Sequence, residues 1–152
     1  RSLSKRDFSR VIKPLKEFGA SFYPKNKSTL PIYIKGGKSI KPIKYYETKG
    51  SAQIKSCIML ATLNAPGTTK IIALKSRNHT EILFKYLKIP IKVKRKKKIT
   101  LIEIKKKDQI ASFNYNIPSD ISSSAFFLVL TILSKNSKLT IKNVNINPTR
   151  RK

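Results

Sequence analysis

The chain has 152 residues, of which 39% are apolar, so it can form one ordinary domain, or parts of two, around a buried core. Its net charge of +27 comes from 34 Lys and Arg against 7 Asp and Glu, and such a charge invites a nucleic-acid-binding interpretation. Lys outnumbers Arg and is scattered over the whole chain, which solvated lysines and a codon bias explain at least as well. A single Cys and a single His exclude an internal disulfide framework and a His-rich or Cys-based metal site. No apolar run reaches the length of a transmembrane helix.

The first third of the chain predicts a helix followed by two short strands. In "RDFSRVIKPLKEFGA" the apolar residues recur at helical spacing up to Gly19, and Pro14 should kink this helix or lie in its first turn. The alternating runs "LPIYIKGG" and "KPIKYYE" are typical of strands.

The middle of the chain predicts a buried helix, a strand, a second helix and a hairpin. A Ser at position 51 precedes an apolar run, so we expect a helix over 51–63, with Cys57 as an inert thiol within it. "KIIALK" reads as a buried strand, and "SRNHTEILFKYLKI" as an amphipathic helix. The apolar positions of that helix are Ile82, Leu83, Tyr86 and Leu87. Residues 90–107 alternate on both sides of a Lys-rich tip, which indicates a hairpin.

The last third repeats part of this order. "ISSSAFFLVLTIL" predicts a second, almost wholly apolar helix, and "SKNSKLTIKNV" predicts a turn and a strand. A helix that is apolar nearly all round must be buried on most sides. Two such helices in repeated units indicate an α/β architecture with helices inside and sheets outside, the reverse of the usual layering.

Several residues could bind an anion. At the start of helix 51–63, free backbone N–H groups and the helix dipole favour a negative ligand beside Ser51, Ala52 and Gln53, although a Ser cap and a first-turn Gln are also ordinary. Arg6 lies at another helix start, and Arg77 follows a buried strand, where ligands often bind. For Arg6 the alternative is a solvated basic turn, which is common in so Lys-rich a chain, and for the "SRNHTE" segment it is a lone His in a loop, the more ordinary case. The sequence contains no paired carboxylates, catalytic triad or Gly-rich phosphate loop.

Taken in order, six segments resemble those of the EPSP synthase (3-phosphoshikimate 1-carboxyvinyltransferase) family. Each segment alone is weakly diagnostic, but their order and spacing through nearly the whole chain are specific. The segments are "SLSKRDFSRVIKPLKEFGA", "LPIYIKGG", "GSAQIKSCIMLATL", "SRNHTE", "IPSDISSSAFFLV" and "NVNINPTR".

This resemblance implies a reaction and a fold. Phosphoenolpyruvate gives its enolpyruvyl group to the 5-hydroxyl of shikimate 3-phosphate, and phosphate leaves through a tetrahedral intermediate, without a metal or organic cofactor. The family fold is an inside-out α/β barrel of repeated βαβαββ units with buried helices and outer sheets, which would be incomplete in this chain. A cytoplasmic enzyme, monomeric at full length, is expected, with no specific nucleic-acid or membrane partner.

The resemblance also implies binding residues. Ser51, Ala52 and Gln53 match positions that hold shikimate 3-phosphate, and Arg77 falls at or beside another such position. Arg6 matches an arginine that binds phosphoenolpyruvate, to which Gln53 is also close. The family usually has Pro-Met after this arginine, whereas Asp7 and Phe8 stand here, and Asp7 could either neutralise Arg6 or cap the helix.

We expect the chain to be an internal fragment of such an enzyme. Residues 1–115 would be the rear part of the first domain and residues 116–152 the start of the second, with no catalytic residue in either. Half of a two-domain cleft cannot close over its substrates, so the isolated chain should be inactive. Two alternatives remain open: a UDP-N-acetylglucosamine enolpyruvyl transferase, and a basic nucleic-acid-binding module.

Overall fold

A computed structural model describes residues 3–150. The chain divides into two compact units, residues 1–111 and residues 112–152.

The first unit begins with a helix packed on a small sheet. Helix α1 (Ser9–Glu17) contacts strand β1 (Ser21–Tyr23), which pairs antiparallel with β2 (Tyr33–Lys35). The predicted helix is confirmed, and Pro14 lies in its interior rather than in its first turn. Gly19, at φ +106°, follows the helix in a conformation that only Gly adopts readily. Strand β1 was not predicted, because the sequence around Ser21–Tyr23 shows no alternating run like that of "LPIYIKGG", which contains β2.

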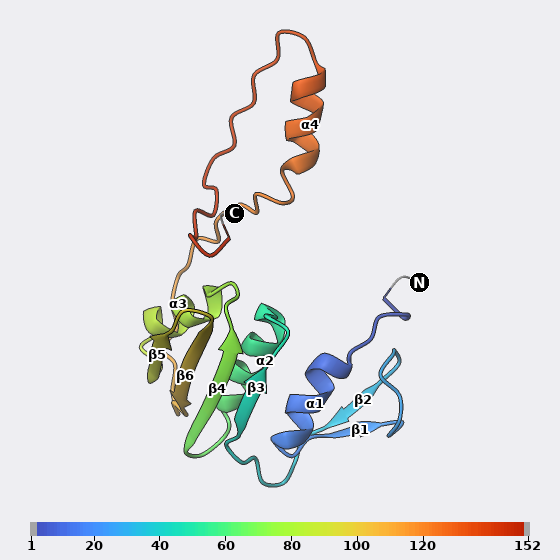
Figure 1. The fold of residues 1–152 in the computed structure, drawn as a ribbon, viewed down its shortest axis with the longest axis vertical. Helices are drawn as coiled ribbons and strands as arrows, with labels where there is room; N and C mark the ends of the chain where they lie inside the picture. Colours follow the sequence, from blue (N-terminus) through green and yellow to red (C-terminus); the bar gives the residue numbers. More distant parts are fainter. Residues whose placement is uncertain (1–2, 151–152) are drawn as a thin grey trace. The chain divides into compact units, whose positions relative to one another are not determined.

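The remainder of this unit is one βαβαββ module (Figure 1). Its four strands form a sheet in the order β3-β4-β6-β5. Strand β3 is parallel to β4, so the chain needs a crossover between them, which α2 provides. The other pairs are antiparallel, and β5–β6 is the predicted hairpin. In chain order the elements are β3 (Lys44–Glu47), α2 (Ala52–Thr62), β4 (Thr68–Leu74), α3 (His79–Tyr86), β5 (Ile91–Arg95) and β6 (Ile99–Lys105).

The core of this module lies between one face of the sheet and its two helices. Alternate residues of β4 and β6 are buried, and the residues between them are partly or fully exposed. One continuous cluster joins the buried sheet residues to α2 and α3, so both helices cover the same face. This confirms helices on the inside and a sheet on the outside. The cluster includes Ile54, Ile58, Met59, Ile71, Phe84, Ile102 and Ile104.

The side of helix α3 that faces the core matches its apolar sequence pattern only in part, because Leu87 packs against the core cluster whereas Ile82 and Tyr86 are exposed. Ile82 and Tyr86 are 46% and 54% exposed. The buried side chains are Glu81 and Phe84, which lie three residues apart on one face. Phe84 joins the core cluster, and Glu81 pairs with Lys55 of α2, a contact that hydrophobic periodicity does not detect.

The second unit contains helix α4 (Ala125–Leu133) and irregular chain (Figure 1). The helix is present as predicted, but none of its residues is buried, and Phe126 is 82% exposed. The strand predicted in "KLTIKNV" is absent from the described chain, apart from a single parallel bridge between Ser119 and Val144. Both differences have one cause: residues 112–150 contain no sheet to cover the helix or to pair with this segment.

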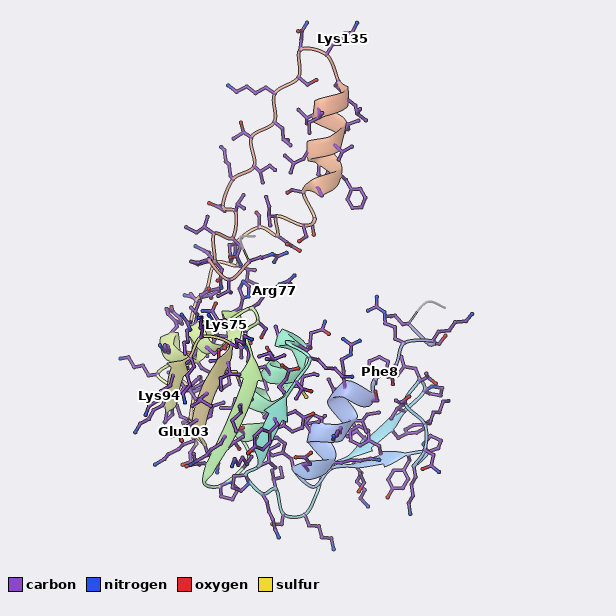
Figure 2. All side chains as sticks on the ribbon, viewed as in Figure 1. Phe8, Lys75, Arg77, Lys94, Glu103 and Lys135 are labelled. Carbon is purple, nitrogen blue, oxygen red and sulfur yellow. The ribbon has the colours of Figure 1, made fainter. Side chains whose placement is uncertain are left out.

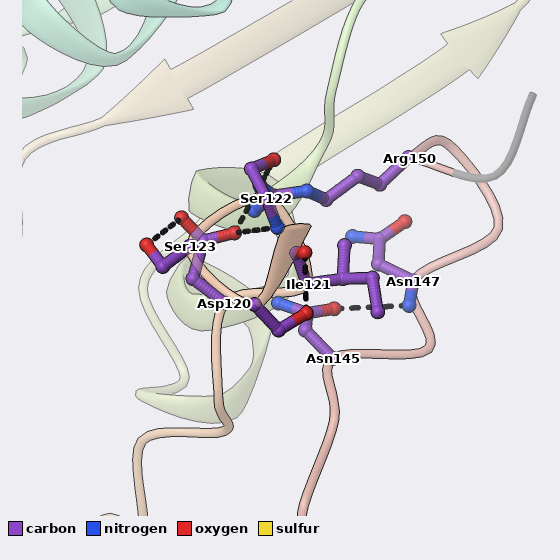
Figure 3. A network of polar contacts seen from close by, with 8 residues as sticks. Asp120, Ile121, Ser122, Ser123, Asn145, Asn147 and Arg150 are labelled. Carbon is purple, nitrogen blue, oxygen red and sulfur yellow. Dashed lines mark hydrogen bonds and ion pairs between the residues drawn. The ribbon is translucent and has the colours of Figure 1, made fainter. Parts of the chain in front are cut away.

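A polar network joins the two ends of the second unit (Figure 3). The Arg150 guanidinium donates to the Asp120 carboxylate and to the Ser122 hydroxyl. The Ser122 backbone N–H, 3.0 Å from Asp120 Oδ1, is the main cause that lowers the pKa of Asp120. Arg150, which alone suggests no role in sequence, therefore helps to hold this unit together.

Truncating Phe84 tests the buried face of α3. Phe84 is 1% exposed, so we expect Phe84→Ala to lower the free energy of unfolding by about 3–5 kcal/mol through lost burial and a cavity. Ile82→Ala, on the exposed side of the same helix, should cost only about 0.5 kcal/mol. Denaturant unfolding followed by circular dichroism measures both changes. Equal losses in the two variants would contradict the observed packing of α3.

Candidate substrate-binding site

The first turn of α2 forms one side of the candidate site. Ser51 adopts an extended conformation (φ −89°, ψ 111°), and its hydroxyl accepts a hydrogen bond from the Ile54 N–H at 3.4 Å. The next N–H groups, of Ala52 and Gln53, come too early in the helix to have an intrahelical acceptor. Ser51 and Ala52 are half-buried, whereas Gln53 is exposed.

This helix terminus suits an anion. No acidic residue lies in the first turn of α2, so no side chain of that turn neutralises the positive end of the helix dipole. The amide of Gln53 offers two donors and an acceptor to a ligand in solvent. The sequence-based prediction that this turn is capped and open to an anion is consistent with this geometry.

The segment between β4 and α3 forms the other side. Arg77 is exposed and lies three residues after the end of β4, and Figure 2 labels it near Lys75 at this end of the strand. An arginine at that position can present its guanidinium to a phosphate or carboxylate with two parallel hydrogen bonds. Gly50, at φ +63°, lies against this end of β4, since a Cβ added there would come within 3.6 Å of the Lys75 carbonyl oxygen.

A buried lysine connects the two sides. Lys55 of α2 donates through Nζ to the Arg77 carbonyl at 2.8 Å and pairs with Glu81 Oε1 of α3 at 2.7 Å. Both side chains are almost fully buried, with 2% and 4% exposed. The hydroxyls of Ser56 and Thr80 lie 2.6 Å apart and add a second contact between the two helices. Ser51, Ala52 and Gln53 are thus joined to the backbone of Arg77.

Sequence reasoning missed the role of Lys55 and Glu81. A signal was present, because Lys55 is the one charged residue inside an otherwise apolar helical run, and a buried lysine is almost always paired. Glu81 stands in the first turn of the next helix, where a carboxylate is ordinarily explained by the helix dipole. The sequence alone does not pair residues that lie 26 positions apart.

Arg6 is placed apart from these residues. It lies exposed in the turn before α1, and within residues 3–150 it makes no hydrogen bond or ion pair with the first turn of α2. The two alternatives for Asp7 are resolved: its carboxylate accepts from the Ser9 N–H at 2.9 Å and from the Ser9 hydroxyl at 2.6 Å. Asp7 therefore accepts the N–H of the first α1 residue from the position before the N-cap, Phe8, and no ion pair between it and Arg6 occurs in the described chain.

Cys57 and the acidic residues offer no further chemistry. Cys57 is half-buried, and desolvation raises the pKa of its thiol, which keeps it protonated as expected of an inert side chain. Among residues 3–150, no three His, Cys, Asp or Glu side chains are grouped so that they could hold a metal ion. None of the described helices combines the length and apolar character needed to cross a bilayer.

Comparison with known proteins identifies the family. A model of EPSP synthase (3-phosphoshikimate 1-carboxyvinyltransferase) matches residues 1–152. The chain belongs to the EPSP synthase family. A curated relative from Caldicellulosiruptor bescii, named 3-phosphoshikimate 1-carboxyvinyltransferase, is 43% identical over 98% of this chain and 35% of its own length. One from Ruthia magnifica, with the same name, is 45% identical over 98% of the chain and 33% of its own length.

A solved structure supports the fold. The EPSP synthase from Acinetobacter baumannii superimposes with a TM-score of 0.74 and 37% sequence identity, over 98% of this chain and 33% of that structure. The chain thus spans about a third of the length of the relatives that it matches. The predicted family and its inside-out α/β fold are confirmed, and the barrel is not closed in this chain. The alternative of a nucleic-acid-binding module is supported only by the net positive charge.

The hydrogen bonds that Asp7 accepts predict a low titration midpoint. The pKa of Asp7 is lowered from 3.8 to about 2, chiefly by the two Ser9 hydrogen bonds, with smaller contributions from Ser28 and Arg10, because all of them favour the charged carboxylate. Its stabilisation of the α1 terminus should be complete above pH 3.8 and lost as the pH falls through about 2. NMR titration of the Asp7 carboxyl carbon measures this midpoint. Ser9→Ala should move it toward 3.8, and an unchanged midpoint in that variant would refute the assignment.

Proposed function

We propose that residues 1–152 form part of an enzyme that transfers the enolpyruvyl group of phosphoenolpyruvate to the 5-hydroxyl of shikimate 3-phosphate. The products are 5-enolpyruvylshikimate 3-phosphate and phosphate, formed in the synthesis of aromatic amino acids. Membership of the EPSP synthase family supports this proposal. The observation that carries it to particular residues is the tie that Lys55 makes between the first turn of α2 and the Arg77 segment.

Ser51, Ala52, Gln53 and Arg77 are the proposed shikimate 3-phosphate residues. Shikimate 3-phosphate carries a phosphate, a carboxylate and hydroxyl groups, so it needs both cationic and neutral donors. The Arg77 guanidinium suits an oxyanion, the N–H groups that begin α2 favour negative charge, and the Gln53 amide can bond a hydroxyl or an oxyanion. The Ser51 hydroxyl accepts from Ile54 and still has a proton to donate.

Arg6 is the proposed phosphoenolpyruvate residue, with Gln53 also close to that substrate. Since Asp7 bonds Ser9 instead of Arg6, the Arg6 guanidinium keeps its donors for a phosphate or carboxylate. Arg6 precedes α1, and α1 packs on α2, the helix that carries Gln53. The support for Arg6 is its match to the family motif and its exposure.

The proposed domain organisation assigns residues 1–115 to the rear of the first domain and residues 116–152 to the start of the second. The active site would then be a cleft that closes over both substrates, with the catalytic groups supplied by chain outside these residues. The complete enzyme would act as a monomer. It would act in the cytoplasm, because phosphorylated metabolites do not cross membranes unaided. It would need no cofactor, since both reacting groups belong to the substrates.

Replacing Gln53 tests the site in the complete enzyme. We expect Gln53→Ala to raise the KM for shikimate 3-phosphate roughly 10- to 100-fold, the effect of losing a hydrogen bond to a charged ligand. The matched control is Gln109→Ala, which removes the other glutamine of the chain, an exposed residue outside the proposed site. Steady-state kinetics with each substrate varied in turn measures both. Equal affinities in the two variants would remove Gln53 from the site.

The isolated chain tests the domain proposal. Residues 1–152 alone should give no measurable enolpyruvyl transfer, because one side of a cleft cannot enclose the reacting groups. Phosphate release from phosphoenolpyruvate in the presence of shikimate 3-phosphate is the assay, and the complete enzyme is the positive control. Turnover by the isolated chain would show that it contains its own catalytic groups.

A further inference from the structure

The buried contact between Lys55 and Glu81 lies between two groups of proposed binding residues. Lys55 is in the first turns of α2, after Ser51 and Gln53, and Glu81 is in the first turn of α3, after Arg77. The third participant is the carbonyl oxygen of Arg77 itself, 2.8 Å from Lys55 Nζ. The Lys55 side chain therefore connects α2, which carries one half of the site, to the backbone of Arg77, which carries the other.

Stability is a poor explanation for this arrangement. Burying two charges costs solvation energy that their mutual attraction often fails to recover, and apolar pairs of similar volume are frequently as stable or more so. Here the compensation is also incomplete, because Glu81 Oε2 is buried and has no hydrogen-bond partner among residues 3–150. What an ion pair adds over an apolar pair is direction, since an ammonium holds its acceptors at fixed distances.

Neighbouring contacts also join the segment before α3 to the start of α2. The Ser56–Thr80 hydroxyl contact and the Lys55–Glu81 pair both join the start of α2 to the start of α3. Gly50 approaches Lys75 closely enough that the chain before α2 lies beside the chain before Arg77. The polar ties are thus concentrated where the two halves of the proposed site meet.

We propose that Lys55, held by Glu81, is a positioning residue for shikimate 3-phosphate, because it fixes the backbone of Arg77 relative to the first turn of α2. This inference rests on the proposed function of Ser51, Gln53 and Arg77. Lys55 itself does not touch the substrate. By bonding the Arg77 carbonyl, its ammonium fixes the backbone position from which the Arg77 side chain extends. It thereby fixes the distance between the Arg77 guanidinium and the N-terminus of α2.

The test replaces the ion pair by apolar side chains in the complete enzyme. Lys55→Met combined with Glu81→Met removes both charges together, so neither is left buried without a partner. We expect the Kd for shikimate 3-phosphate to rise roughly 10- to 100-fold, as for a small displacement of a binding group, while the thermal unfolding temperature is kept. Isothermal titration calorimetry and thermal unfolding measure the two quantities.

Two controls separate positioning from a general structural role. Lys107→Met removes a similar contact, since Lys107 Nζ donates to the Leu87 carbonyl at 2.8 Å, but at the far end of α3. It should leave the Kd unchanged. In an Arg77→Ala background the double Met change should weaken binding by no more than about 2-fold further, because Lys55 acts only through Arg77. Additive losses in that background would overturn the proposal.

A second variant covers the case in which the double Met enzyme does not fold. Glu81→Gln preserves the shape of the side chain but weakens its hold on Lys55, and should raise the Kd about 3- to 10-fold, again only when Arg77 is present. An unchanged Kd in a folded Glu81→Gln or double Met enzyme would also overturn the proposal. A wild-type enzyme that fails to turn over shikimate 3-phosphate would contradict the proposed function instead, so the two failures are distinguishable.

Discussion

The packing of α2 against one face of the β3–β6 sheet is the interaction on which the first unit depends. Strands β3 and β4 run parallel, so the chain must return across the sheet between them, and α2 is that return. Its buried residues Ile54, Ile58 and Met59 meet alternate residues of β4 and β6. Because α1 packs on the same helix, α2 is covered by the sheet and by α1, and only a few residues such as Leu60 remain exposed.

This packing also places the candidate site. A crossover helix begins near the end of the strand that precedes it, and the next crossover begins where β4 ends, so the starts of α2 and α3 come to one edge of the sheet. The backbone groups that begin α2 and the Arg77 side chain therefore lie at the same edge without any long-range loop. The fold brings the two segments to one edge of the sheet, and the contacts of Lys55 connect α2 to the Arg77 carbonyl and to Glu81.

Regular features of the first unit could be predicted from sequence because they depend on local patterns. The N-cap of α2 at Ser51 and the β5–β6 hairpin follow from capping and alternation, and both are present. The predicted positions of Ser51, Gln53 and Arg77 at element ends are likewise confirmed, although their roles stay predictions. Features set by distant partners were missed: the pairing of β1 with β2, the burial of Phe84 rather than Tyr86, and the Lys55–Glu81 contact.

Helices α2 and α4 show why burial cannot be read from a helix alone. Both begin after small polar residues and continue as apolar runs, yet Ile58 is fully buried in α2 while Ile132 is 81% exposed in α4. The two helices differ in what surrounds them, because α2 is followed by strands that complete its unit and α4 is followed by chain with a single β-bridge. In repeat architectures each unit buries its apolar face only when its own strands or a neighbour are in place. Burial of α4 therefore depends on a completed unit. The apolar sequence of the helix predicts that other elements cover it, and residues 112–150 contain no element that does so.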